Sequence, residues 1–194
     1  MYRLGVLLAA GASRRFGPDD KLLAPYHGAA LVCSAATALL GAGCDATIAI
    51  VSSTEVAAVL PAGIEICLVE AGRPLANSFR LAIDLAVERG ASHLLICLGD
   101  MPNVTPDLLR QLAVRNISCA CLAEDSRTPP ILLVATDYSA ARASADGDRG
   151  ARHFLATMPA QALIAVDPAE VLDIDRPNDL TPKPGRLHSS EHGM

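Results

Sequence analysis

Cationic residues gather directly after the first apolar run of the sequence. The stretch LLAAGASRRFGPDDK, residues 7–21, turns at Gly11 and then carries Arg15 and Lys21. A glycine allows a sharp turn and a close approach to a ligand, and successive backbone N–H groups in such a turn form a concave anion site. Arg15 and Lys21 would add fixed positive charge. The stretch is therefore typical of a loop that binds phosphate, with an ordinary arginine-bearing surface loop as the alternative.

The spacing of this loop differs from three common motifs. The P-loop pattern G-x-x-x-x-G-K-[ST] does not occur, because Gly17 comes too late after Gly11 and is followed by Pro18 rather than lysine. The dinucleotide pattern G-x-G-x-x-G does not occur either. Ser13 is followed by two arginines and not by x-Gly, which argues against a nucleophile elbow.

Acidic residues follow two later apolar runs. Asp100 stands in LGDMP, residues 98–102, and Asp175 stands in DIDRPNDL, residues 173–180. Mg²⁺ takes oxygen ligands, usually one or two carboxylates together with substrate phosphates. A carboxylate beside a cationic phosphate loop therefore indicates a divalent cation, with Asp100 as its ligand and Asp175 as a candidate second ligand. The alternative is that both residues cap a turn or a helix.

A basic segment, GDRGARHFL, lies at residues 147–155. It is either a pocket that binds the phosphate of an acceptor substrate through Arg149, or a solvated helix start with Asp148 at the N-cap.

These residues need elements that bring them together. Seven strand-length runs are apolar throughout rather than alternating, which is typical of strands buried on both faces of a parallel sheet. Helical patterns lie between several of them, at residues 31–40, 77–90 and 105–115. Alternating strands and helices predict a doubly wound α/β fold, in which ligands bind beyond the carboxyl ends of the strands. The runs are residues 4–9, 47–51, 64–69, 94–98, 119–122, 131–134 and 163–166.

The length and composition predict one domain over residues 1–180 and a mobile polar tail over residues 181–194. A net charge of −5 and 3% aromatic residues argue against a nucleic-acid partner. The apolar stretches 4–10 and 26–44 are poor candidates for a leader and a membrane span, so we expect a soluble cytoplasmic chain. The six cysteines form no C-x-x-C motif, and we expect them to be buried thiols in a reducing compartment.

Together, the motifs resemble those of the nucleotidyltransferases that make sugar nucleotides and molybdenum cofactor dinucleotides. LAAGASRRFGPDDK (residues 8–21), LGDMP and DIDRPNDL occur in the order in which that family carries its opening signature, its metal aspartate and its closing acidic segment. The double alanine before Gly11, the GDMP form and GDRGARHFL are most similar to molybdenum cofactor cytidylyltransferases. The resemblance implies a Rossmann-like three-layer α/β/α sandwich with a mostly parallel sheet, of the nucleotide-diphospho-sugar transferase type.

The resemblance also implies roles for individual residues. The backbone of Leu8, Ala9, Ala10 and Gly11 would line the nucleotide. Ser13, Arg15 and Lys21 would bind its phosphates, and Ser78 would contact its base. Asp100 would hold Mg²⁺, with Asp175 in the place of a second metal ligand, and Arg15, Lys21 and Asp100 would carry catalysis. Arg127 lies in RTPPILL, residues 127–133, which resembles an acceptor-side segment, although Pro129 stands where that segment has a histidine.

The implied reaction is transfer of CMP from CTP to a pterin-phosphate acceptor such as molybdopterin, with release of pyrophosphate. Three alternatives stay open: guanylyl transfer from GTP, nucleotidyl transfer to a sugar phosphate, and a non-catalytic module that delivers cofactor to a molybdoenzyme or its chaperone.

Overall fold

A computed structural model describes residues 1–11, 16 and 20–180. The predicted phosphate ligands Ser13 and Arg15 and the predicted mobile tail, residues 181–194, lie outside the described residues. Within them, a seven-stranded sheet has the strand order β5-β4-β1-β6-β8-β7-β9, and a small hairpin is formed by β2 and β3. The strands are β1 (Arg3–Ala9), β2 (Pro25–Tyr26), β3 (Ala29–Ala30), β4 (Ala46–Val51), β5 (Glu65–Leu68), β6 (His93–Leu98), β7 (Cys119–Ala123), β8 (Ser126–Val134) and β9 (Leu163–Val166).

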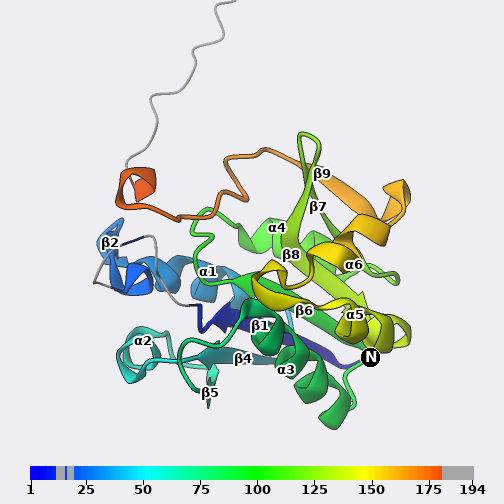
Figure 1. Ribbon diagram of the computed structural model, residues 1–194, viewed down its shortest axis with the longest axis horizontal. Helices are drawn as coiled ribbons and strands as arrows, with labels where there is room; N and C mark the ends of the chain where they lie inside the picture. Colours follow the sequence, from blue (N-terminus) through cyan, green and yellow to red (C-terminus); the bar gives the residue numbers. More distant parts are fainter. Residues whose placement is uncertain (12–15, 17–19, 181–194) are drawn as a thin grey trace, which may run out of the picture.

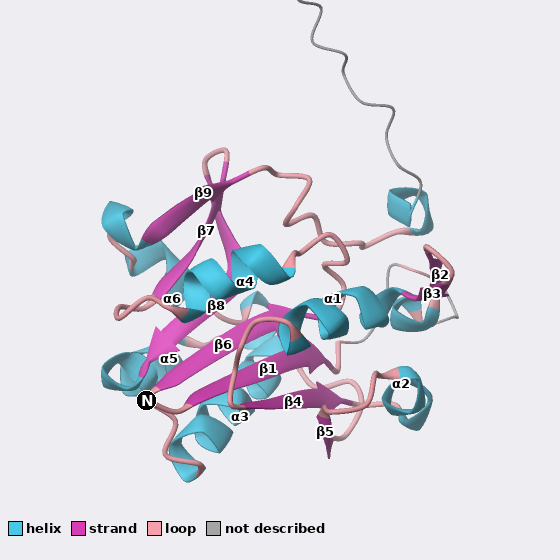
Figure 2. Ribbon diagram, turned by 180° about the vertical axis from the view of Figure 1, so that it is seen from behind, coloured by secondary structure: helices cyan, strands magenta, loops and turns pink. Residues whose placement is uncertain are grey.

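Helices cover both faces of the sheet, which confirms the predicted three-layer architecture. Figure 1 shows α3, α5 and α6 in front of the sheet, and Figure 2 shows α1 and α4 on the opposite face. The α-helices are α1 (Leu31–Leu40), α2 (Thr54–Val59), α3 (Leu75–Glu88), α4 (Pro106–Ala113), α5 (Tyr138–Ser144) and α6 (Arg152–Thr157). Short 3₁₀ turns are η1 (Lys21–Leu23), η2 (Ala135–Asp137), η3 (Gly147–Arg149), η4 (Ala160–Ala162) and η5 (Pro177–Leu180).

All seven apolar runs of the sequence form strands of the central sheet. Strands β1, β4, β5 and β6 are mutually parallel, as is the pair β7 and β9. Strand β8 runs antiparallel to both β6 and β7. The apolar pattern did not reveal this direction, because β8 is also buried between its neighbours. Its cause is the short turn at Glu124 and Asp125, since so short a link can join only antiparallel strands.

The helix predicted at residues 77–90 begins two residues earlier, at Leu75. Pro74 precedes it with extended backbone angles, φ −56° and ψ 151°, so neither Asn77 nor Ser78 caps it. The start of α4 agrees with its sequence, because the Thr105 side chain accepts a hydrogen bond from the Leu108 N–H.

Strands β1 and β6 are parallel neighbours, with Leu8 paired to Leu98. From β1 the chain builds outward through β4 and β5, and then returns to the other side of β1 as β6. This reversal between β1 and β6 is the topological switch point at which ligands bind in open α/β sheets. It brings Gly11 and Asp100, which follow these two strands, to one edge of the sheet.

Three of the six cysteines are buried, as predicted: Cys97, Cys119 and Cys121. Their burial raises the thiol pKa values to about 12, 11 and 12, so these thiols stay neutral. Cys33, Cys44 and Cys67 are half-buried instead. None of the helices in the described ranges is both long and apolar enough to cross a bilayer.

The segment between α5 and α6 is held against α3 by two contacts. Arg80 of α3 donates a hydrogen bond to the Ala145 carbonyl. Gly150 has φ 52° and ψ −118°, a backbone conformation that favours glycine, and a Cβ atom there would lie 2.9 Å from Leu75 Cδ2. These contacts fix the position of Arg149, which lies between them in sequence.

We expect Gly150→Ala to lower the free energy of unfolding by about 2–3 kcal/mol, because the new methyl group meets Leu75 and the backbone conformation is strained. Gly147→Ala is the matched control: its φ is 43°, but a Cβ there meets nothing within 4 Å. It should cost about 1 kcal/mol. Urea unfolding of both variants measures the difference, and equal stabilities for the two variants would contradict this packing.

Candidate active site

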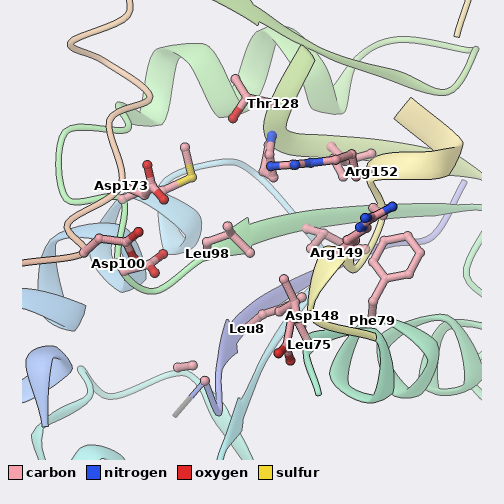
Figure 3. Close-up of a pocket in the computed structure, with 18 of the residues that line it drawn as sticks. Leu8, Leu75, Phe79, Leu98, Asp100, Thr128, Asp148, Arg149, Arg152 and Asp173 are labelled. Atoms are coloured by element: carbon pink, nitrogen blue, oxygen red, sulfur yellow. The ribbon is translucent and has the colours of Figure 1, made fainter. Parts of the chain in front are cut away.

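A cavity of about 670 Å³ opens at the switch-point edge of the sheet. Its floor includes Leu8 and Leu98, from the ends of β1 and β6, and Phe79 of α3 lines it as well. Figure 3 shows Asp100 and Asp173 at one end of the cavity and Arg149 and Arg152 at the other. The cavity therefore has an acidic end, with Asp100 and Asp173, and a basic end, with Arg149 and Arg152; one further carboxylate, that of Asp148, also lines the cavity.

Lys21 lies at the centre of the acidic end. Its Nζ donates to Asp100 Oδ2 at 2.7 Å, to the Ile174 carbonyl at 3.0 Å and to Asp175 Oδ1 at 3.4 Å. The side chains of Lys21 and Asp100 are 12% and 21% exposed, so their ion pair is largely shielded from water. Burial alone would lower the pKa of Lys21, but the charges of Asp100 and Asp175 outweigh burial and raise it. Lys21 therefore carries its positive charge throughout the neutral range.

Local structure fixes each member of this cluster. Lys21 opens the turn η1, at whose start Asp20 Oδ1 accepts a hydrogen bond from the Leu22 N–H at 3.0 Å. Asp100 follows Gly99, where a Cβ would lie 3.1 Å from the Ala9 Cβ, so that glycine lets the end of β6 lie close against β1. The Ile174 N–H donates to the Asp100 carbonyl at 2.9 Å and ties the distant 173–175 segment to the same place.

Asp173 is a third carboxylate at the acidic end, and its place there was not predicted from the sequence. Burial and the neighbouring charges of Asp100 and Asp175 raise its pKa. The D-x-D spacing carried the signal: in an extended segment, alternate side chains point to the same side. The capping role considered for Asp175 belongs instead to Asp179, whose Oδ2 accepts from the N–H groups of Asp175 and Arg176 at 3.2 and 2.8 Å.

The acidic end has the chemistry of a site for a divalent cation shared with phosphate. In the described part of the chain, no three or more histidine, cysteine, aspartate or glutamate side chains are arranged to hold a metal ion by themselves. Mg²⁺ needs fewer protein ligands when phosphate oxygens complete its shell. The carboxylates of Asp100 and Asp175, both in contact with the Lys21 ammonium, fit that requirement.

The basic end contains Arg149, as the sequence suggested, together with Arg152, which was not predicted from the sequence. Both residues line the cavity. Arg152 lies three residues after Arg149 and is the first residue of α6. Asp148 lies within η3 and does not cap α6, whose N-cap is Ala151. The helix-start interpretation of Asp148 is therefore wrong.

Arg127 also lines the cavity, but its guanidinium is engaged elsewhere. Its Nη1 donates to the carbonyl of Leu155 at 2.9 Å and to the carbonyl of Ala156 at 2.5 Å. These acceptors lie near the C-terminal end of α6, where cations are favoured. Arg127 thus holds α6 against β8, and the adjacent Pro129–Pro130 bond is cis.

Ser78 lies outside the large cavity. It lines a second hollow of about 340 Å³, together with Ala10, Asn77 and the Glu70–Arg73 ion pair. Arg73 borders both cavities, so the two are adjacent. Of the predicted backbone ligands, Leu8, Ala9 and Gly11 line the large cavity, whereas Ala10 faces the small one.

Comparison with known proteins shows which family and which relatives this sequence matches. The sequence matches the family described as MobA-like NTP transferase domain over residues 5–163. A relative from Paenarthrobacter nicotinovorans, named nicotine blue oxidoreductase, is 32% identical over 80% of this chain and 82% of its own length. A relative from Mycobacterium avium, named probable molybdenum cofactor guanylyltransferase, is 27% identical over 93% of this chain and 94% of its own length.

Solved structures share the fold. The crystal structure of Rv0371c from Mycobacterium tuberculosis is similar with a TM-score of 0.77 and 28% identity, covering 92% of this chain and 94% of that one. The same protein in complex with manganese is similar with a TM-score of 0.72 and 25% identity, over 92% of this chain and 96% of that one. With a family match over most of the described domain and neighbours that share its fold, the chain belongs to the MobA-like NTP transferases, a family of nucleotidyltransferases.

Proposed function

We propose that this protein transfers a nucleoside monophosphate, CMP from CTP, to the phosphate of a pterin acceptor such as molybdopterin and releases pyrophosphate. The observation that carries the proposal is the 2.7 Å contact between the Lys21 ammonium and Asp100 at the rim of the large cavity. A cation that can bind triphosphate and a carboxylate that can bind metal thereby share one site.

The two adjacent cavities suggest where each substrate part binds. The base would enter the hollow beside Ala10 and Ser78, and the triphosphate would lie along Gly11 toward Lys21. The acceptor would take the basic end, where Arg149 and Arg152 offer guanidinium groups suited to anions. Arg15 and Ser13 remain proposed phosphate ligands on sequence grounds alone, and Arg127 positions α6 in this proposal.

The reaction needs little covalent work from the protein. An oxygen of the acceptor phosphate forms a bond to the α-phosphorus of the nucleotide, and the bond from that phosphorus to the pyrophosphate oxygen breaks. The attacking oxygen is already anionic, so no general base is required, and no histidine is among the described residues that line the cavity. Lys21 would hold the phosphates and balance the charge that grows on pyrophosphate.

Mg²⁺, held by Asp100 and Asp175, would neutralise phosphate charge and align the reacting oxygens when bound. The carboxylates fit this task because backbone contacts bring their two chain segments together. The Ile174 N–H to Asp100 carbonyl hydrogen bond, at 2.9 Å, joins the two parts of the chain that supply them. This contact keeps the two segments side by side before any substrate arrives.

The second candidate is guanylyl transfer from GTP, which the name of the Mycobacterium avium relative favours. Calorimetric titration with CTP, GTP and ATP in the presence of Mg²⁺ distinguishes the two candidates. We expect CTP to bind at least about tenfold more tightly than the others, a difference of about 1.4 kcal/mol. Tighter GTP binding would replace CMP by GMP in the proposal, and binding of none of the three nucleotides would contradict it.

We expect Lys21→Ala and Asp100→Ala each to reduce turnover by roughly 100-fold or more, because the first removes the cation that would bind the phosphates and the second removes a carboxylate that would hold the metal. Pyrophosphate release with CTP and molybdopterin measures the effect. Arg142→Ala, which breaks an exposed ion pair with Asp84 outside the cavity lining, is the control and should keep normal turnover. Near-normal rates for either active-site variant would refute the assignment.

For the acceptor end, we expect Arg149→Ala to raise the KM for the acceptor by about tenfold or more, since a hydrogen bond to a charged group contributes about 1.5–3 kcal/mol. The affinity for CTP should stay unchanged, because Arg149 lies at the end of the cavity opposite to Asp100. Steady-state kinetics with each substrate varied in turn separates the two constants. An effect on CTP alone would move Arg149 out of the acceptor site.

A further inference from the structure

The contacts that Lys21 makes in the structure conflict with its proposed role, which is to bind the phosphates of the nucleotide. An ammonium group has three N–H donors. Among the described residues, three acceptors surround this one: Asp100 Oδ2, Asp175 Oδ1 and the Ile174 carbonyl, at 2.7, 3.4 and 3.0 Å. A phosphate group that takes these donors must displace acceptors of the protein, and two of the three are the proposed metal ligands.

The same ammonium occupies the space between the proposed metal ligands. Asp100 and Asp175 both contact it, so a divalent cation that binds both carboxylates must enter where the Lys21 charge now lies. A metal ion and the Lys21 ammonium in contact with the same two carboxylates would repel each other strongly, because the site is shielded from water. Lys21 and a metal ion therefore compete for the same pair of carboxylates.

We propose that Lys21 is an internal counter-ion that exchanges partners during substrate binding. Without substrate it neutralises Asp100 and Asp175. When nucleotide and metal arrive together, it moves from the carboxylates to the triphosphate and leaves the carboxylates to the metal. This inference rests on the proposed function, because it takes a metal–nucleotide complex as the ligand of this site. Its consequence is that metal alone binds weakly and nucleotide and metal bind with positive coupling.

The backbone segments that carry the two carboxylates have contacts that do not involve Lys21, which makes the exchange practicable. The Ile174 N–H donates to the Asp100 carbonyl, and Asp179 caps the N–H groups of Asp175 and Arg176. These backbone contacts do not involve the ammonium. When Lys21 leaves, the segment that carries Asp173 and Asp175 stays beside Asp100, so the metal ligands need not reassemble.

A third carboxylate makes the counter-ion necessary. Asp173 lines the same end of the cavity as Asp100 and Asp175. Beyond the effect of burial, the charges of Asp100 and Asp175 act on Asp173 and help to raise its pKa, whereas the Lys21 charge opposes that rise. The removal of Lys21 should thus leave an excess of negative charge that attracts a divalent cation in its place.

The test measures Mn²⁺ binding to the full chain without nucleotide. Binding is detected as a loss of the free-ion signal in electron paramagnetic resonance. We expect Lys21→Met, which keeps length but removes charge, to bind Mn²⁺ about tenfold or more tightly than the unmodified protein, within the 5- to 150-fold range typical of coupled sites. Lys21→Gln should behave in the same way and serves as a second variant if Lys21→Met does not fold. Lys21→Arg, which keeps the charge, should bind Mn²⁺ weakly.

Arg142→Met is the matched control, because it removes one positive charge at an exposed ion pair with Asp84, outside the cavity lining. It should leave Mn²⁺ affinity unchanged, which separates a local exchange from a general change in net charge. If the folded Lys21→Met and Lys21→Gln proteins bind Mn²⁺ no more tightly than the unmodified protein, the exchange is wrong.

The same titrations distinguish failure of this inference from failure of the proposed function. Pyrophosphate release by the unmodified protein, combined with unchanged Mn²⁺ binding in the neutral variants, would overturn the exchange and leave the proposed function standing. Tighter Mn²⁺ binding in the neutral variants, without any pyrophosphate release by the unmodified protein, would support the competition between Lys21 and metal and overturn the proposed reaction.

Discussion

The contact between Lys21 and Asp100 organises the acidic end of the cavity. It joins the loop that follows β1 to the loop that follows β6, over 79 positions of sequence. The ammonium also reaches the 173–175 segment, so three distant parts of the chain meet at one nitrogen atom. Removal of either partner would leave the other charge shielded from water and without compensation. The other residues of the acidic end lie around this ion pair.

The sheet supplies the geometry in which this pair can form. Parallel pairing of β1 with both β4 and β6 turns the carboxyl ends of these strands to one edge. The reversal of strand order beside β1 then leaves that edge open, between helices on the two faces. Helix α3 contributes Phe79 to the cavity and holds the Arg149 segment through Arg80 and Gly150. The acidic end thus depends on the ends of β1 and β6, and the basic end depends on α3.

The apolar runs and the glycine and aspartate positions predicted the layers, the strands and the meeting of Lys21 with Asp100. What they could not predict arises from side-chain packing. Arg127 was expected near the acceptor, yet its guanidinium holds α6. This contact could not be predicted from the sequence, because its acceptors are backbone carbonyls, which every residue carries. Asp173 was overlooked although it shares its segment with Asp175, and the D-x-D spacing was the signal that could have identified it. The direction of β8 followed from a short turn and not from hydrophobicity.

The most direct test of the account is a crystal structure with Mn²⁺ and a CTP analogue that cannot be cleaved at the α-phosphorus. The account predicts anomalous scattering from Mn²⁺ next to Asp100 and Asp175, with the Lys21 ammonium on the phosphates and no longer between the two carboxylates. Mn²⁺ bound elsewhere, with Lys21 still in contact with Asp100, would contradict the central claim.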